Sequence, residues 1–173
     1  MRKIDTGRRA FLRGALLTRA GRKAEASRQQ PLGPAPPWHR RWPLHDVCPN
    51  CPRPCVAACE PGIIRLHPAD HTLAGTPYLD FRVTGCTFCK ACVQACPLDI
   101  EISDPVNPAI GTALLNRDTC IAWNDVICMS CSGRCDYQAI TTVYQRRAEV
   151  NPETCNGCGM CVAACPVGAI SIG

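Results

Sequence analysis

The stretch Cys155–Pro166 reads CNGCGMCVAACP and places four cysteines immediately before a proline. Three comparable groups precede it in a chain of 173 residues, and the four groups together use all 16 cysteines. In chain order, group one is Cys48, Cys51, Cys55 and Cys59; group two is Cys86, Cys89, Cys92 and Cys96; group three is Cys120, Cys128, Cys131 and Cys135; and group four is Cys155, Cys158, Cys161 and Cys165. Such an internal repeat predicts four similar structural units.

Groups two and four have the spacing C-x2-C-x2-C-x3-C-P, which is typical of [4Fe–4S] ferredoxins. Three thiols two residues apart can surround three irons of one cube in a tight loop. The fourth thiol leaves along a short helix and points toward the cube of a partner group. We therefore expect four [4Fe–4S] clusters, with the 16 cysteines as their iron ligands. Each cluster takes three ligands from one group and one from another.

Disulfides and zinc are weaker interpretations of the same cysteines. A disulfide framework requires oxidising surroundings, which nothing in the sequence indicates. Zinc sites usually combine two CxxC pairs across a longer spacer and would leave many of these thiols unused. Two groups depart from the ferredoxin spacing. Group one carries one extra residue, and group three contains the insertion 121–127, which we expect to loop outward, followed by Asp136 where proline would stand.

The pairing of the groups is open on spacing alone. Sequential pairing joins group one with two and group three with four, giving two tandem ferredoxin folds. Nested pairing joins group one with four and group two with three. The connecting segments of 26, 23 and 19 residues permit both arrangements. Analogy with the four-cluster subunits of molybdenum oxidoreductases slightly favours nested pairing.

The body of the chain is expected to be a small α+β fold. An isoleucine follows the last cysteine by five residues in three groups (Ile64, Ile140 and Ile170), whereas group two has Ile100 and Ile102. Each unit thus predicts a strand, a cysteine loop, a short helix and a strand. The strands are expected in runs such as 78–83 and 141–145. Aromatic residues are only 5% of the chain, so we expect the clusters to supply part of the folding free energy.

The fold class is thus α+β: a ferredoxin-like polyferredoxin body with two paired cluster modules, preceded by a basic, Pro-rich arm. The arm and its linker cover residues 1–43, and the body covers 44–173. Within the body the motifs occupy 48–59, 86–96, 120–135 and 155–165. Trp38 and Trp42 are expected to pack the end of the linker onto the body.

Charge is divided between these two parts. Residues 1–42 hold 11 Lys and Arg and 2 acids, a net charge of +9, whereas residues 43–173 have a net charge of −4. The arm is either a solvated tail or a docking element for an acidic partner. The body offers no basic stripe for nucleic acid. Arg8-Arg9 is similar to a twin-arginine export signal, but the apolar run that follows is too short, so we expect a cytoplasmic protein without a membrane span.

The remaining candidate residues are weak. His67 and His71 are spaced for one face of a helix, but Pro68 between them argues against a metal-binding helix. We therefore expect both to lie in a surface loop. The sequence contains no recognisable set of nucleophile, histidine and acid and no phosphate-binding glycine loop. We expect no catalytic residues, and hence a protein that is not an enzyme.

The opening MRKIDTGRRAFLRG, the Pro-rich stretch and the stretched third group resemble the NapF family of ferredoxin-type proteins, which belongs to the periplasmic nitrate reductase system. The resemblance covers nearly the whole chain. Its most discriminating element is IDxxRR at residues 4–9, because CNGCGMCVAACPVGAI is shared with ferredoxins in general. The extra residue in group one departs from the family pattern. Carried over, the family's ligands are the 16 cysteines named above.

The resemblance implies a cytoplasmic accessory protein that acts on the catalytic subunit of periplasmic nitrate reductase before that subunit is exported. Its role would be maturation of the precursor, including assembly of the subunit's own cluster. The alternative is a plain electron carrier between redox partners. A carrier needs only clusters near its surface, whereas a maturation factor also needs a recognition element. The basic arm offers such an element and favours maturation.

The cluster potentials are expected to differ because charged residues lie inside three of the motifs. Group one contains Arg53, group two contains Lys90 and group three contains Arg134, whereas group four has only neutral residues. Positive charge stabilises the reduced, more negative cube and raises its potential. On this basis, the group-four cube is predicted to be the hardest to reduce.

Overall fold

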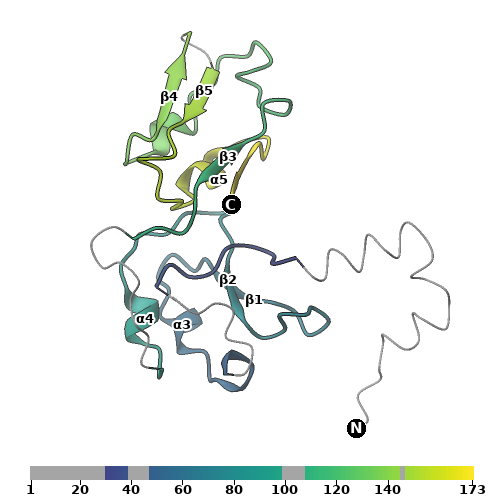
Figure 1. Cartoon of the computed structure of the whole chain (residues 1–173), viewed down its shortest axis with the longest axis vertical. Coiled ribbons are helices and arrows are strands. Elements are labelled where there is room, and N and C mark those ends of the chain that lie inside the picture. The colour runs from purple at the N-terminus through teal and green to yellow at the C-terminus, as the bar shows by residue number, and fades with distance from the viewer. Residues whose placement is uncertain (1–29, 39–46, 99–107, 145–146) are drawn as a thin grey trace, which may run out of the picture.

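The computed structural model describes residues 30–38, 47–98, 108–144 and 147–173. They form two lobes, the lower and the upper one in Figure 1. The first lobe comprises residues 30–38 and 47–98, and the second comprises 108–144 and 147–173. The first contains η2 (Cys48–Asn50), α3 (Pro54–Ala57), β1 (Ile64–Leu66), β2 (Pro77–Leu79) and α4 (Ala91–Gln94). The second contains β3 (Ala113–Leu115), η3 (Ser132–Arg134), β4 (Ile140–Val143), β5 (Arg147–Val150), α5 (Met160–Ala164) and β6 (Ile170–Ile172).

The six strands in the described residues form three two-stranded antiparallel sheets. Hairpin β1–β2 lies between groups one and two, with Ile64 opposite Leu79. Hairpin β4–β5 lies between groups three and four in the same way. Strand β3 pairs with β6, so the two ends of the second lobe meet. The predicted α+β fold class is therefore confirmed for the described residues.

The recurring isoleucines begin strands, as the sequence predicts. Ile64, Ile140 and Ile170 are the first residues of β1, β4 and β6, and each is buried with an exposed residue after it. Such alternation is expected for a strand with one face on the core. Ile100 and Ile102 lie outside the described residues.

The short helices share an unusual start. The residue before α3, α4 and α5 is Arg53, Lys90 or Gly159, each two residues before the third cysteine of its group and each in the left-handed region with φ between 62° and 81°. This conformation turns the chain sharply between the second and third cysteine. For Arg53 and Lys90 it costs about 1–3 kcal/mol, because only glycine adopts it without strain.

The core is thin, as the composition indicates. In the second lobe it combines Ala113, Ala148, Ile140 and Ile170 with buried cysteines. In the first lobe it combines Ile63, Ile64, Leu79 and Phe81, and Val162 and Ile172 of the second lobe pack against this cluster. The two lobes therefore share apolar contacts. No helix in the described ranges is long and apolar enough to cross a bilayer.

Within the first lobe, residues 30–38 pack against residues 47–98. The amide of Leu79 in β2 donates to the carbonyl of Pro34 over 2.8 Å. Trp38 is only 1% exposed, and its ring meets Phe88 edge-on at 6.4 Å between centroids. The ammonium of Lys90 lies 5.4 Å from the centre of the same ring. The expected packing of Trp38 is confirmed, and Trp42 lies outside the described residues.

The expectation that His67 and His71 lie in a surface loop is wrong, because both are buried. The Leu32 amide donates to Nε2 of His67 over 3.2 Å, so Nδ1 carries the proton and donates to the Thr76 carbonyl over 2.9 Å. His71 accepts from the Leu73 amide and donates through Nε2 to the carbonyl of Gln30. The two neutral rings therefore anchor the start of the 30–38 segment. Burial lowers the pKa of His67.

Candidate metal centres

Four pockets in the described residues are each lined by four cysteines, and together they use all 16. The group-one pocket has Cys48, Cys51, Cys55 and Cys96; the group-two pocket has Cys86, Cys89, Cys92 and Cys59; the group-three pocket has Cys120, Cys128, Cys131 and Cys165; and the group-four pocket has Cys155, Cys158, Cys161 and Cys135. The space around each set of cysteines, open solvent included, is about 390, 340, 320 and 310 Å³ respectively, so the four pockets are similar in extent.

The structure pairs the groups sequentially, and the nested arrangement favoured by analogy is wrong. In every pocket three cysteines come from one group, and the fourth is the last cysteine of the neighbouring group. The physical reason is local. Each hairpin, β1–β2 or β4–β5, reverses the chain between two consecutive groups and brings them side by side. The short helix or turn before the last cysteine then carries that thiol away from its own group.

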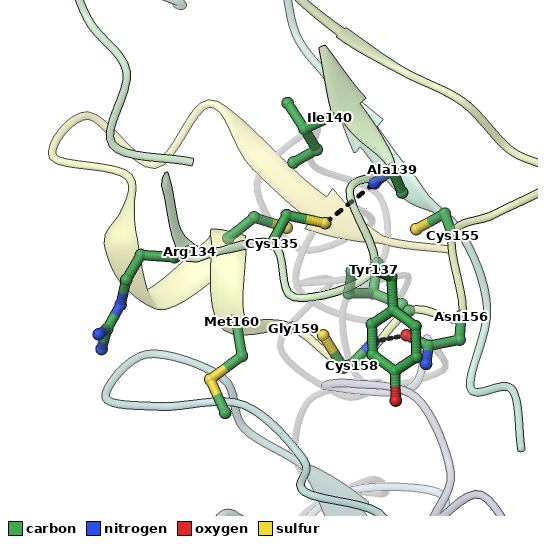
Figure 2. A pocket seen from close by; sticks show the side chains of 13 residues that line it. Arg134, Cys135, Tyr137, Ala139, Ile140, Cys155, Asn156, Cys158, Gly159 and Met160 are labelled. Carbon is green, nitrogen blue, oxygen red and sulfur yellow. Dashed lines mark hydrogen bonds between the residues drawn. The ribbon is translucent and has the colours of Figure 1, made fainter. Parts of the chain in front are cut away.

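The group-four pocket shows how the thiols are placed (Figure 2). Cys155 and Cys158 come from the loop before α5, Cys161 from α5 itself and Cys135 from the end of η3. The amide of Ala139 donates to the sulfur of Cys135 over 3.3 Å. Asn156 fixes the loop because its side-chain oxygen accepts the Cys158 amide over 3.2 Å.

Backbone amides also donate to thiols in other pockets. The amide of Ala169 donates to the sulfur of Cys165, which lies four residues earlier, over 3.2 Å. The amide of Ala139 contacts the sulfur of Cys135 with the same spacing. In group two Phe88 donates to Cys86 over 3.4 Å. Hydrogen bonds to the sulfurs stabilise negative charge there and belong to the means by which proteins set cluster potentials.

The thiols are crowded and partly buried, which disfavours their charged form. Burial, followed by repulsion from neighbouring thiols, raises the pKa of Cys92 to about 12, and the neighbours include Cys86 and Cys59 of the same pocket. The same causes raise the pKa of Cys161 to about 12. Four thiolates can coexist in such a pocket only when bound cations offset their repulsion. The donor set therefore fits an iron–sulfur cube.

The thiols of a cube bind four different irons, so they surround a larger space than the ligands of a single ion. In the described parts of the chain no three His, Cys, Asp or Glu side chains converge closely enough to hold one metal ion. The pockets are lined mainly by apolar residues such as Ile140, Ile170 and Leu79.

Because the groups pair sequentially, one charged residue lines a different pocket from the one that its position in the sequence predicts. Arg134 belongs to group three by sequence but lines the group-four pocket, because its neighbour Cys135 reaches into that pocket. The expectation that group four lacks a charged neighbour is therefore wrong. Arg53 lines the group-one pocket and Lys90 the group-two pocket. The described residues lining the group-three pocket include no charged side chain.

Two contributions to the pockets escaped the sequence analysis. Pro37 and Trp38 form part of the group-two pocket wall, and only the aromatic residue after the prolines hinted at this. The insertion in group three loops outward only in part. Ile121 and Ala122 line the group-three pocket, whereas Ile127 is 75% exposed.

Comparisons with known proteins agree with this geometry. Residues 47–100 match the family model described as a 4Fe-4S dicluster domain, and residues 148–171 match that of a 4Fe-4S binding domain. The first match spans groups one and two, the pair that the first lobe joins. The chain is 34% identical to the ferredoxin-type protein NapF of Escherichia coli K12, over 98% of this chain and 95% of that protein. It is also 32% identical to the methylamine utilization ferredoxin-type protein MauM of Paracoccus denitrificans, over 68% of this chain and 60% of that one. The chain belongs to the NapF family of ferredoxin-type iron–sulfur proteins.

Proposed function

We propose that the chain binds four [4Fe–4S] clusters, one in each cysteine pocket. The proposed ligands are the 16 cysteines, three from one group and the fourth from its sequential partner. The observation that carries this proposal is that four pockets of similar size take four cysteines each and leave none over. When bound, the clusters supply one-electron redox chemistry, and the chain's residues hold and shield them. The proposal assigns no catalytic residue and no enzymatic activity.

The test of occupancy is an iron and sulfide assay on protein purified without oxygen. About 16 irons per chain are expected, four per cube. The variants Cys59→Ser and Cys96→Ser probe the pairing, since each removes the fourth thiol of the other group's pocket. Cys59→Ser should perturb the cube next to Lys90, and Cys96→Ser the cube next to Arg53. A preparation with about eight irons and full helix and strand content would contradict the proposal.

We further propose that the protein is a cytoplasmic accessory factor for the catalytic subunit of periplasmic nitrate reductase and acts on its precursor before export. Membership of the NapF family and the net charge of +9 in residues 1–42 support this proposal. The arm is proposed to recognise the precursor. The described part of the arm, residues 30–38, packs on the body, and its Trp38 lines the group-two pocket.

The experiment is a pull-down from cytoplasm with the full chain and with residues 1–26 deleted, which keeps the 30–38 segment. The full chain should recover the precursor, and added salt should weaken the complex because charges on the arm are screened over about 10 Å at 0.1 M. Two matched double variants separate motif from charge. Arg8→Gln with Arg9→Gln should weaken recovery more than Arg22→Gln with Lys23→Gln, although both remove two charges.

The second candidate function is electron transfer between redox partners. It is favoured by the contact between the group-two and group-four loops described below, because contact between cluster loops suits passage of electrons. Two results would select it over maturation: no precursor is recovered by the full chain, and the precursor made without this protein contains its complete cluster. Recovery of the precursor together with an iron-deficient cluster in its absence supports maturation.

A further inference from the structure

The two lobes meet at cysteines that line different pockets. The amide of Cys86, in the group-two pocket, donates to the carbonyl of Cys158, in the group-four pocket, over 2.7 Å. Two residues before Cys86, the hydroxyl of Thr84 donates to the sulfur of Met160 over 3.8 Å. A single hydrogen bond thus links two residues whose thiols face different pockets.

Two glycines permit this approach. A Cβ atom on Gly85 would lie 2.5 Å from the carbonyl oxygen of Cys158 and 2.6 Å from the amide nitrogen of Met160. A Cβ atom on Gly159 would lie 2.3 Å from the ring of Phe81 in the first lobe. These separations are shorter than side chains allow, so the close contact depends on the absence of side chains. In Figure 2 the side chain of Met160 points away from the thiols of its own pocket.

Each of the four pockets is lined by residues of one lobe alone. The residues that line the group-one and group-two pockets belong to the first lobe, and those that line the group-three and group-four pockets belong to the second. Within each lobe the two groups exchange their last cysteines: group one with group two, and group three with group four. Contact between groups two and four therefore places the four pockets in the order one, two, four, three, which differs from their order in the sequence.

We propose that the Cys86–Cys158 contact is the electron-transfer junction of the molecule and joins the four sites into one line with groups one and three at its ends. This proposal rests on the proposed occupancy of the pockets by clusters. With cubes held by Cys86 and its pocket and by Cys158 and its pocket, one electron would pass across this contact, so that one cube would be oxidised and the other reduced. No bond forms or breaks. The electron comes from a low-potential one-electron donor outside the chain, for which dithionite serves in the experiment.

The test compares Gly85→Ala with Gly133→Ala. Gly133 is matched because it also lies within the cysteine-rich part of the chain and has no positive φ, but a Cβ atom there would meet nothing within 4 Å. Both variants are purified as the full chain without oxygen and assayed for iron, and amide exchange at Cys86 shows whether the contact has opened. Dithionite-reduced samples are then studied by EPR, in which neighbouring reduced cubes broaden and split each other's signals.

In the wild type three neighbour interactions are expected, one in each lobe and one across the junction. Gly85→Ala should retain full iron, open the Cys86 amide and lose the junction interaction, leaving the sum of two independent pairs. Gly133→Ala should match the wild type. An unchanged spectrum in an iron-replete Gly85→Ala protein with an open Cys86 amide overturns the junction, as does an equal loss in Gly133→Ala.

A second variant covers incomplete loading of Gly85→Ala. Met160→Ala removes the side chain that lies next to Gly85 and Thr84 and leaves every cysteine in place, and it should reduce the same interaction at full iron. An unchanged spectrum in that variant, again with an open Cys86 amide, rejects the junction. A wild-type protein with fewer than four cubes is a different result, because it contradicts the occupancy proposal and is seen in the iron assay before any spectrum is compared.

Discussion

Replacing Trp38 with alanine should detach the 30–38 segment from the first lobe. Trp38 is 1% exposed, its ring pairs edge-on with Phe88, and the ammonium of Lys90 lies over it. Truncating a buried tryptophan to alanine costs about 3–5 kcal/mol. The ring pair supplies about 0.5–1.5 kcal/mol of this, and the cation–π contact about 0.5–1 kcal/mol. Because about 1.4 kcal/mol corresponds to a factor of ten, the loss reduces protection of the segment's hydrogen bonds about 100-fold or more.

Hydrogen–deuterium exchange measures this directly. The Leu79 amide, which donates to Pro34, should exchange faster in Trp38→Ala, whereas the Thr112 amide, which donates to Gly173 in the second lobe, should keep its rate. The group-two pocket also loses part of its wall, so its cube should bleach faster in air than the other three. Trp38→Phe keeps an aromatic ring and should give a smaller effect. Unchanged exchange at Leu79 in Trp38→Ala would refute the packing energy assigned to this residue.

Four further predictions concern the clusters and the stability of the first lobe. Arg134→Gln should lower the midpoint potential of the group-four cube in a redox titration, while Arg117→Gln, which removes an exposed charge that lines none of the four cysteine pockets, should leave all midpoints in place. In the same titration the group-three cube should be the hardest to reduce, and equal midpoints would contradict the charge argument. Acidification should destabilise the first lobe, because the lowered pKa of His67 means that the unfolded chain binds more protons than the folded one. The free energy of unfolding should therefore fall as the pH drops below about 6.5. In denaturation curves between pH 5 and 8, His67→Gln should flatten this dependence. Chelation of the iron should abolish most of the ordered structure seen by circular dichroism, since the core of each lobe holds few large apolar residues beside its cysteines, and an apo form that melts cooperatively with full helix content argues against this.

The sequence predicts those features that local spacing decides. The positions of the cysteines define the four loops, and the isoleucine five residues after the last cysteine marks the strands that begin at Ile64, Ile140 and Ile170. These features follow from the chain geometry within one unit. The pairing of the groups lies beyond one unit, which is why the nested arrangement was wrongly favoured. It depends on which connections form hairpins, and connections of 19 to 26 residues allow more than one pairing.

The buried histidines and the position of Arg134 required contacts between distant residues. His67 accepts from Leu32 across 35 positions, and His71 donates to Gln30 across 41, so Pro68 correctly excluded a helix without indicating burial. Arg134 lines the group-four pocket only because sequential pairing sends Cys135 there. No periodicity or local propensity carries this information.

The differences between the motifs of groups two and four can be explained by what packs on each loop. CTFCKACVQACP and CNGCGMCVAACP share one backbone path, with positive φ at Phe88 and Lys90 in the first and at Gly157 and Gly159 in the second. In group two both positions carry side chains that meet Trp38 of the 30–38 segment.

In group four no side chain fits at either position. A Cβ atom on Gly157 would lie 2.5 Å from the Gly111 carbonyl, and one on Gly159 would meet the Phe81 ring. The strain of about 1–3 kcal/mol at each non-glycine position in group two is thus offset by contacts with Trp38. In group four glycine removes the strain and also makes room for the other lobe. Glycines at these two motif positions therefore occur where neighbouring groups leave no space for a side chain. Larger residues occur where their own side chains pack against Trp38.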